Sequence, residues 1–159
     1  MSTIYLDNAA TTKVRKEVAD SISLVIQNEY GNPSSTHSYG RSSKALVELS
    51  RKEIADILNV KSSEIIFTSG GTEGDNMIIR NCVNNLGVTH IVSSKIEHHA
   101  VTHTIDNLLL SKNIKVSYVE VFENGDINLD DLKDILKDTT DKTLVSLMHI
   151  NNEIGNITD

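Results

Sequence analysis

Residues 64–73, EIIFTSGGTE, decide how this sequence folds. The first half of the stretch, 64–68, is a short run of β-branched and aromatic residues, which predicts a strand. Gly70 and Gly71 then break the run, and a helix is expected over about 72–86. A strand that enters a glycine turn and continues as a helix is typical of an alternating strand–helix domain.

The sequence downstream continues this alternation. It predicts further strands at 90–93, 115–121 and 143–150 and further helices at 100–110 and 129–136. Asn128, with Asp131 three residues later, is a candidate N-cap for the last helix. Strands that alternate with helices form a mostly parallel sheet with helices on both faces, so the predicted fold class is α/β.

A helical segment precedes this domain. Apolar residues recur at helical spacing over 14–27 and 38–58, and the turn-forming residues 31–35, GNPSS, separate the two helices. We therefore divide the sequence into an amino-terminal helical segment, 1–59, and an α/β domain, 60–159. The last predicted strand runs almost to the final residue, so we expect this domain to be incomplete.

Composition excludes several classes of protein. The 159 residues carry a net charge of −7 and no cluster of Lys and Arg, which argues against nucleic-acid binding. Apolar runs are far shorter than the roughly 20 residues that span a bilayer, and we expect neither a membrane segment nor a signal peptide. A single cysteine is consistent with a reducing compartment, and we expect a cytoplasmic protein.

The glycine turn is a candidate phosphate site. Gly70 and Gly71 let the backbone approach an anion closely, and the first turn of the following helix offers free amide donors. The hydroxyls of Ser69 and Thr72 add further donors. An ordinary tight turn explains the stretch alone equally well, and the turn lacks the ending of a P-loop.

A histidine pair marks the start of the helix at 100–110. In residues 97–100, EHHA, a histidine ring could change charge near neutral pH or stack on an aromatic cofactor. The bland alternative is a pair of exposed histidines. His99 and His103 share a helix face, but the order of residues does not match a metalloprotease motif, and we expect no metal site.

A third polar group follows the last predicted strand. Residues 151–155, NNEIG, place two amides and a carboxylate where a polar ligand could be oriented. Taken alone, this composition favours a solvated turn. All three groups follow strands at their carboxyl ends, however, and a parallel sheet brings such ends to one edge, where α/β proteins bind their ligands.

Five motifs in this order resemble the cysteine desulfurase family. They are 5–12 (YLDNAATT), 31–35 (GNPSS) with His37, 67–73 (FTSGGTE) with Asn76, 97–100 (EHHA) and 148–155 (MHINNEIG). The ordered set covers nearly the whole sequence and is far more specific than any single motif. The sequence is therefore similar to the amino-terminal portion of a fold-type-I enzyme of the class V aminotransferase group, which uses pyridoxal 5′-phosphate (PLP).

The resemblance implies roles for four residues. Gly71 and Thr72 would bind the cofactor phosphate, His98 would stack on the cofactor ring and assist proton transfer, and Asn152 would contact the cofactor or the substrate. It also gives the helical segment 1–59 a role in cofactor-site entry and dimer contacts.

The reaction that the resemblance implies converts L-cysteine to L-alanine and passes the sulfur to an enzyme persulfide. The product sulfur would reach a sulfur-acceptor or scaffold protein for iron–sulfur cluster or thiolated-cofactor assembly, and the enzyme would be a homodimer. The family's Schiff-base lysine and catalytic cysteine lie downstream of residue 159, and neither Lys95 nor Lys112 occupies the lysine motif. We expect Cys82 to be a core residue and the chain alone to be inactive.

Two alternatives stay open at this point. The chain could be a noncatalytic binding or dimerisation module that needs a complementary chain. It could also belong to a selenocysteine lyase or to another class V enzyme, because the motifs present do not separate these activities.

Overall fold

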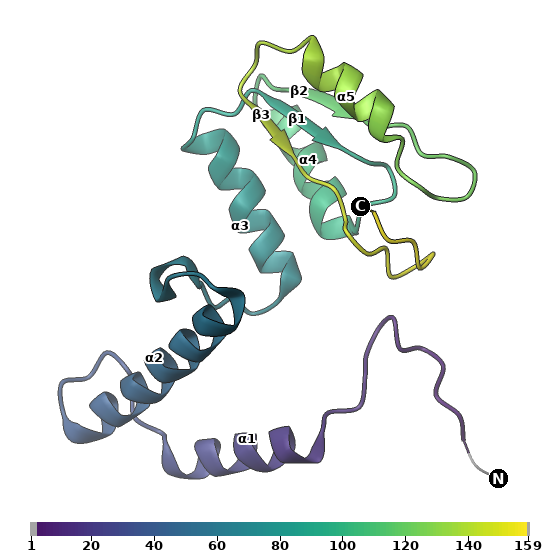
Figure 1. Ribbon diagram of the computed structural model, residues 1–159. Helices are drawn as coiled ribbons and strands as arrows, with labels where there is room; N and C mark the ends of the chain where they lie inside the picture. Colours follow the sequence, from purple (N-terminus) through teal and green to yellow (C-terminus); the bar gives the residue numbers. More distant parts are fainter. Residues whose placement is uncertain (1–2, 159) are drawn as a thin grey trace. The chain divides into compact units, whose positions relative to one another are not determined.

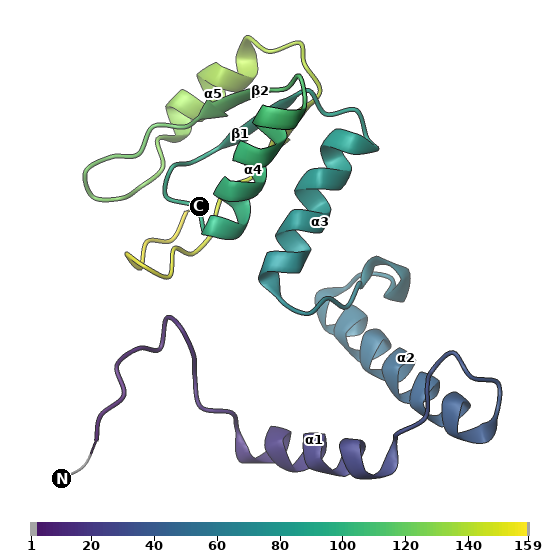
Figure 2. The same ribbon diagram turned by 180° about the vertical axis from the view of Figure 1, so that it is seen from behind.

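The structure is a computed structural model that describes residues 3–158. The chain divides into two compact units, an amino-terminal unit up to Phe67 and a carboxy-terminal unit from Thr68. The first contains α1 (Lys16–Asn28), α2 (Ser38–Leu58) and a short 3₁₀ turn (Ser62–Glu64). The second contains α3 (Gly71–Asn84), β1 (His90–Ser93), α4 (His99–Ser111), β2 (Lys115–Tyr118), α5 (Leu129–Lys137) and β3 (Thr143–Val145) (Figures 1 and 2). The predicted boundary at residue 59, and the role given to segment 1–59, stay predictions.

The two helices of the amino-terminal unit form where the sequence predicts them. His37 caps α2, and its Nδ1 accepts a hydrogen bond of 3.3 Å from the amide of Gly40. The helix ends at Asn59, whose φ of 54° is the left-handed conformation that terminates many helices. No residue of α1 is buried, and α2 buries only small residues. Local caps and turns, rather than an apolar core, therefore define these helices.

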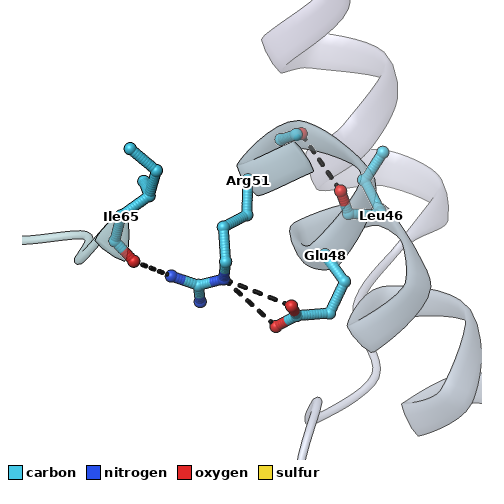
Figure 3. A network of polar contacts seen from close by, with 5 residues as sticks. Leu46, Glu48, Arg51 and Ile65 are labelled. Atoms are coloured by element: carbon cyan, nitrogen blue, oxygen red, sulfur yellow. Dashed lines mark hydrogen bonds and ion pairs between the residues drawn. The ribbon is translucent and has the colours of Figure 1, made fainter. Parts of the chain in front are cut away.

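The strand predicted at 64–68 is wrong. Glu64 ends the 3₁₀ turn, and residues 65–68 are not paired with any strand in the part of the chain that the structure describes. Arg51 of α2 contacts this segment instead, because its Nη1 donates to the Ile65 carbonyl at 2.6 Å (Figure 3). The Arg51 guanidinium also lies 4.7 Å from the centre of the Phe67 ring. The same side chain donates from Nε to Glu48 at 3.2 Å. A run with strand composition forms a strand only when a partner strand is available.

The carboxy-terminal unit holds a parallel sheet, as predicted, and its strand order is β2-β1-β3. His90 of β1 is in register with Lys115 on one side and with Thr143 on the other. Both outer strands are shorter than the predicted ranges 115–121 and 143–150. The cause lies in β1, which ends at Ser93 and offers no ladder partner beyond that residue.

Helices cover both faces of this sheet, and the two faces have separate cores. On one face, Ile91 packs with residues of α3 and α4, including Ile79 and Ile105, and Cys82 is partly buried against this cluster, as expected. On the other face, Val92 packs against residues of α5 and its flanking segments, including Ile135. Alternate residues of a strand point to opposite faces, so the fully buried strand β1 supplies both cores.

Asn128 is the N-cap of α5, as predicted. Its side-chain oxygen accepts hydrogen bonds of 3.1 Å from the amides of Asp130 and Asp131. Asp131 does not complete a capping box, because its carboxylate accepts from the amide of Glu120 at 2.8 Å. The cap therefore also ties the start of α5 to the segment that follows β2.

Candidate functional site

A hollow of ≈ 450 Å³ lies where β1 and β3 end at their carboxyl sides. The loop after β1 and the loop after β3 form its walls. The lining residues are Ile96, Glu97 and His98 from the first loop, His99 from the start of α4, and Met148, Asn151, Asn152, Glu153 and Ile154 from the second loop. The structure thus brings His98 and Asn152, both predicted as site residues, to one hollow.

A second groove of ≈ 260 Å³ adjoins it between the starts of α3 and α4. Thr72, Asn76 and Arg80 line it from α3, and His98 and His103 are among the residues that line it from α4. His98 lines both spaces, with Thr72 on one side and Asn152 on the other. Gly71 lines neither space, although it is the first residue of the same helix turn. His98 and Asn152 follow β1 and β3, as the predicted convergence requires, whereas Thr72 reaches the groove at the start of α3 and not from a strand of the sheet.

His98 owes its position to the start of α4. It is the N-cap residue, and its Nδ1 accepts a hydrogen bond of 3.1 Å from the amide of Ala100. In the neutral ring the proton must then be on Nε2, because a nitrogen that accepts a hydrogen bond carries no hydrogen. The side chain is exposed, so Nε2 is the nitrogen that a ligand can reach.

The glycine turn leaves open backbone at the start of α3. A side chain built at Gly70 or Gly71 would meet no atom within 4 Å, and no side chain of the described residues caps this helix end. Glu73 accepts a hydrogen bond from the amide of Ser69 at 2.6 Å, and this bond lowers the pKa of the Glu73 carboxyl. Space and free amide donors at a helix start suit an oxyanion such as a phosphate group.

Asn76 connects the glycine turn with the start of α4. Its Nδ2 donates to the Thr72 carbonyl at 2.9 Å and to the Ala100 carbonyl at 3.4 Å. Its Oδ1 accepts from the Thr104 hydroxyl at 2.6 Å and from Arg80 Nε at 3.2 Å. One side chain therefore holds the turn that contains Thr72 against the helix that His98 caps.

Two further side chains hold the loops together, and the sequence did not reveal either role. Glu97 accepts hydrogen bonds from the Met148 amide at 2.7 Å and from the Ser94 hydroxyl at 3.0 Å. Burial raises the pKa of the Glu97 carboxyl, although these bonds act in the opposite direction. Asn151, which is 6% exposed, donates to the Ile96 carbonyl at 3.0 Å. The contacts of Glu97 with Met148 and of Asn151 with Ile96 join residues more than 50 positions apart, so local pattern could not indicate them.

The two amides of the predicted Asn-Asn-Glu group have different surroundings. The Oδ1 of Asn151 accepts from the amides of Glu153 and Ile154, at 2.9 and 3.3 Å, so this side chain is committed to the loop itself. Asn152 is exposed and faces the hollow. Of the pair, Asn152 is therefore the amide that a ligand can engage.

The remaining histidines of α4 stack on each other. The rings of His99 and His103 lie 5.0 Å apart with an angle of 24° between their planes. Between residues 3 and 158 there is no group of three or more His, Cys, Asp or Glu side chains that could hold a metal ion. No helix in the same range is both long and apolar enough to cross a membrane.

The sequence matches the model of the aminotransferase class-V family over residues 4–159. The chain belongs to this family. The curated cysteine desulfurase IscS of Dictyoglomus turgidum is 44% identical to it over 156 residues, which are 97% of this chain and 39% of the relative. The chain therefore spans about two fifths of the length of such relatives.

Solved structures show the same fold. A NifS-like protein matches with a TM-score of 0.85 and 35% identity over 95% of this chain and 41% of its own. A structure of SspA in complex with cysteine matches with a TM-score of 0.85 and 30% identity, over 98% of this chain and 45% of its own. The expected resemblance to cysteine desulfurases, with the fold that it implies, is confirmed.

Proposed function

We propose that this chain supplies the amino-terminal part of a PLP-dependent cysteine desulfurase. One observation carries the proposal: His98 lines two adjoining spaces, with Thr72 in one and Asn152 in the other. In this arrangement Gly71 and Thr72 hold the cofactor phosphate, the His98 ring stacks on the cofactor, and Asn152 contacts the cofactor or the substrate. The residues fit the group, because the helix start has open backbone and both His98 and Asn152 are exposed.

Bound PLP supplies an electron sink for reactions at the α-carbon of an amino acid. The residues of this chain orient the cofactor and handle one proton. The Ala100 amide engages His98 Nδ1, so Nε2 carries the hydrogen of the neutral ring and is the atom that can donate to the ligand; to accept a proton, the ring would have to give up the Ala100 bond. The Asn152 amide can both donate and accept hydrogen bonds, which suits it to orient a polar substrate.

L-cysteine is the proposed substrate. The relatives are named cysteine desulfurases, and one matching structure is described as a complex with cysteine. The proposed products are L-alanine and a persulfide whose sulfur passes to an acceptor or scaffold protein, in an enzyme that acts as a homodimer. The lysine and cysteine that this chemistry needs do not correspond to Lys95, Lys112 or Cys82, so we expect no turnover by the 159 residues alone.

A second candidate role is that of a noncatalytic module that pairs with a complementary chain. The apolar residues of α1 favour it, because Val18, Ile22 and Ile26 are 47%, 51% and 71% exposed. Exposed apolar surface of this kind is typical of a protein–protein interface.

Binding of pyridoxamine 5′-phosphate tests the cofactor site. This probe has an amine in place of the reactive aldehyde, so it cannot attach covalently to surface lysines. We expect His98→Asn to weaken binding at least about tenfold, since a loss of stacking of about 1.4 kcal/mol corresponds to that factor. Asparagine is a good N-cap and keeps the start of α4 intact.

Two controls make the result specific. Asp106→Asn changes an exposed side chain of the same helix that lines neither space, and it should leave the affinity unchanged. Pyridoxamine without phosphate should bind more weakly than the phosphorylated probe, and Thr72→Val should reduce that difference. Equal affinities of the original chain and the His98→Asn variant would contradict the proposed site.

A further inference from the structure

We propose that Asn156 is a positioning residue that holds the Asn152 loop in its site-forming conformation. The inference rests on the proposed function, because it assumes that Asn152 contacts the ligand. Asn156 does not line the hollow, and no motif of the sequence pointed to it. It acts through a turn between β2 and α5, residues 122–126, that lies more than 25 positions earlier in the sequence.

The side chain of Asn156 connects the loop with this turn. Its Nδ2 donates to the Asn124 carbonyl at 2.9 Å and to Asp126 Oδ1 at 2.7 Å. The turn is itself ordered, since Asn124 Nδ2 donates to Asp126 Oδ2 at 2.7 Å and the Phe122 amide donates to the Asp126 carbonyl at 2.9 Å. The side-chain amide of Asn156 therefore binds to a turn whose conformation is fixed by its own hydrogen bonds.

The backbone of Asn156 closes the loop that contains Asn152. Its carbonyl accepts a hydrogen bond of 2.9 Å from the Asn151 amide, and the Gly155 amide donates to the Asn151 carbonyl at 2.8 Å. Ile150 and Ile157 pair as an antiparallel bridge just outside these bonds. Asn152 is thus held between the buried Asn151 on one side and the Asn156 contact on the other.

Gly125 makes the close approach of the two segments possible. Its φ of +88° is a conformation that favours glycine, and a Cβ at this position would overlap the Cδ1 methyl of Ile154. It would also lie 3.2 Å from Asn156 Nδ2. A larger residue at 125 must therefore displace the Ile154 side chain and strain the backbone of the turn that Asn156 contacts.

The decisive variant is Asn156→Asp. It keeps the size of the side chain but places a carboxylate against the Asp126 carboxylate, which removes the donor and introduces repulsion. The added change Asp126→Asn supplies a new donor in the opposite direction, so the double variant should restore the contact with residue 126, although not the bond to the Asn124 carbonyl. Asn113→Asp, in an exposed position before β2, is the matched control for charge.

Two readouts separate positioning from general stability. We expect Asn156→Asp to raise the hydrogen exchange rates of the Glu153, Ile154 and Gly155 amides about tenfold, while the amides of β1 keep theirs. The variant should also weaken pyridoxamine 5′-phosphate binding as much as Asn152→Ala does. The double variant should recover part of both losses, because one of the two bonds returns, and Asn113→Asp should show neither loss.

The outcomes distinguish this inference from the proposed function. Unchanged exchange in Asn156→Asp, or faster exchange with full ligand affinity, would overturn the positioning role. If Asn152→Ala itself leaves the affinity unchanged, the proposed role of Asn152 fails. Exchange in Asn156→Asp and in the double variant then still decides whether Asn156 holds the loop. Gly125→Ala, which acts on the contact from the other segment, should reproduce the faster exchange.

Discussion

The two units of this chain use their apolar residues in opposite ways. Among the residues that the structure describes, ten of the eleven buried hydrophobic residues belong to the carboxy-terminal unit, and Ala55 alone belongs to the amino-terminal one. The amino-terminal unit is nevertheless rich in apolar side chains, and those of α1 are exposed. The comparison shows that an amphipathic sequence specifies a helix without specifying what its apolar face packs against.

The contacts that form the described site also lie in one unit. The hydrogen bonds described above that position His98, Thr72 and Asn152 lie within the carboxy-terminal unit, where the packed sheet holds the loops in place. The amino-terminal unit depends on contacts such as the His37 cap and the Arg51 hydrogen bond to Ile65. We therefore expect mutations in the two units to have very different costs.

The largest expected effect is that of Ile91→Ala. Ile91 is fully buried in the centre of the sheet, and loss of a large aliphatic core side chain typically lowers the free energy of unfolding by about 2–5 kcal/mol. Ile22→Ala in α1 is the matched variant, and we expect less than about 1 kcal/mol because Ile22 is 51% exposed. Urea unfolding followed by circular dichroism measures both. Equal losses would show that α1 is packed in solution.

The sequence predicted the positions of helices and strands better than the contacts that these elements make. Helical spacing and turn residues were enough to locate both helices of the amino-terminal unit and the parallel strands around β1. Residues 64–68 have strand composition, yet Arg51 and not a neighbouring strand satisfies the Ile65 carbonyl. Local composition cannot specify such a partner, because it depends on contacts that form only in the folded chain.

The same limit applies to the site. The motifs predicted that His98 and Asn152 converge, because the carboxyl ends of parallel strands meet at one edge. For Thr72 the reason was wrong, since residues 3–71 form no strand before it and the start of α3 places it. They did not predict the buried contact of Asn151 with Ile96. That contact depends on where two loops meet, and no spacing within one loop encodes it.

A smaller effect is expected at the start of α5. Asn128→Ala removes the oxygen that accepts from the Asp130 and Asp131 amides, and loss of an N-cap costs about 1 kcal/mol. Arg15→Ala at the start of α1 is the counterpart in the other unit. Arg15 makes no side-chain cap, so its loss should change the free energy of unfolding by less than about 0.5 kcal/mol. An equal loss of unfolding free energy in Arg15→Ala and Asn128→Ala would show that the two helix starts do not differ in this way.

The next effect depends on pH and concerns the buried His90. Its ring contacts the Ser117 hydroxyl at 2.9 Å. Burial lowers the pKa of the ring, and the nearby charge of Lys115 lowers it further, whereas Asp141 acts in the opposite direction. The folded state therefore favours the neutral ring, while the unfolded state takes up a proton near pH 6.5. The His90 contribution to stability is present above this pH and is lost as the pH falls through it.

The size of this pH effect follows from the uptake of a single proton by the His90 ring. Between pH 7 and pH 6 the loss is at most about 0.7 kcal/mol, because the unfolded ring takes up only part of one proton over this range. The measurement is the difference in unfolding free energy between the original chain and His90→Gln as a function of pH. A difference that stays constant from pH 8 to pH 5 would show that His90 is not held neutral.

The smallest effect is expected on the surface of α1. Lys16 and Asp20 form an exposed ion pair one helical turn apart, and pairs of this kind contribute about 0.3–0.5 kcal/mol. Lys16→Ala should change the free energy of unfolding by no more than this, and less at high salt. A loss above about 1 kcal/mol would indicate that α1 depends on its charges more than its exposure suggests.

A nuclear magnetic resonance titration with pyridoxamine 5′-phosphate tests the central claim most directly. If the carboxy-terminal unit forms the cofactor-binding edge, the shifted amides should cluster at the glycine turn (70–73), at the start of α4 (98–100) and in the Asn152 loop (151–155). The resonances of the α1 and α2 amides should not shift. Shifts confined to the amino-terminal unit, or spread evenly over both units, would contradict the account.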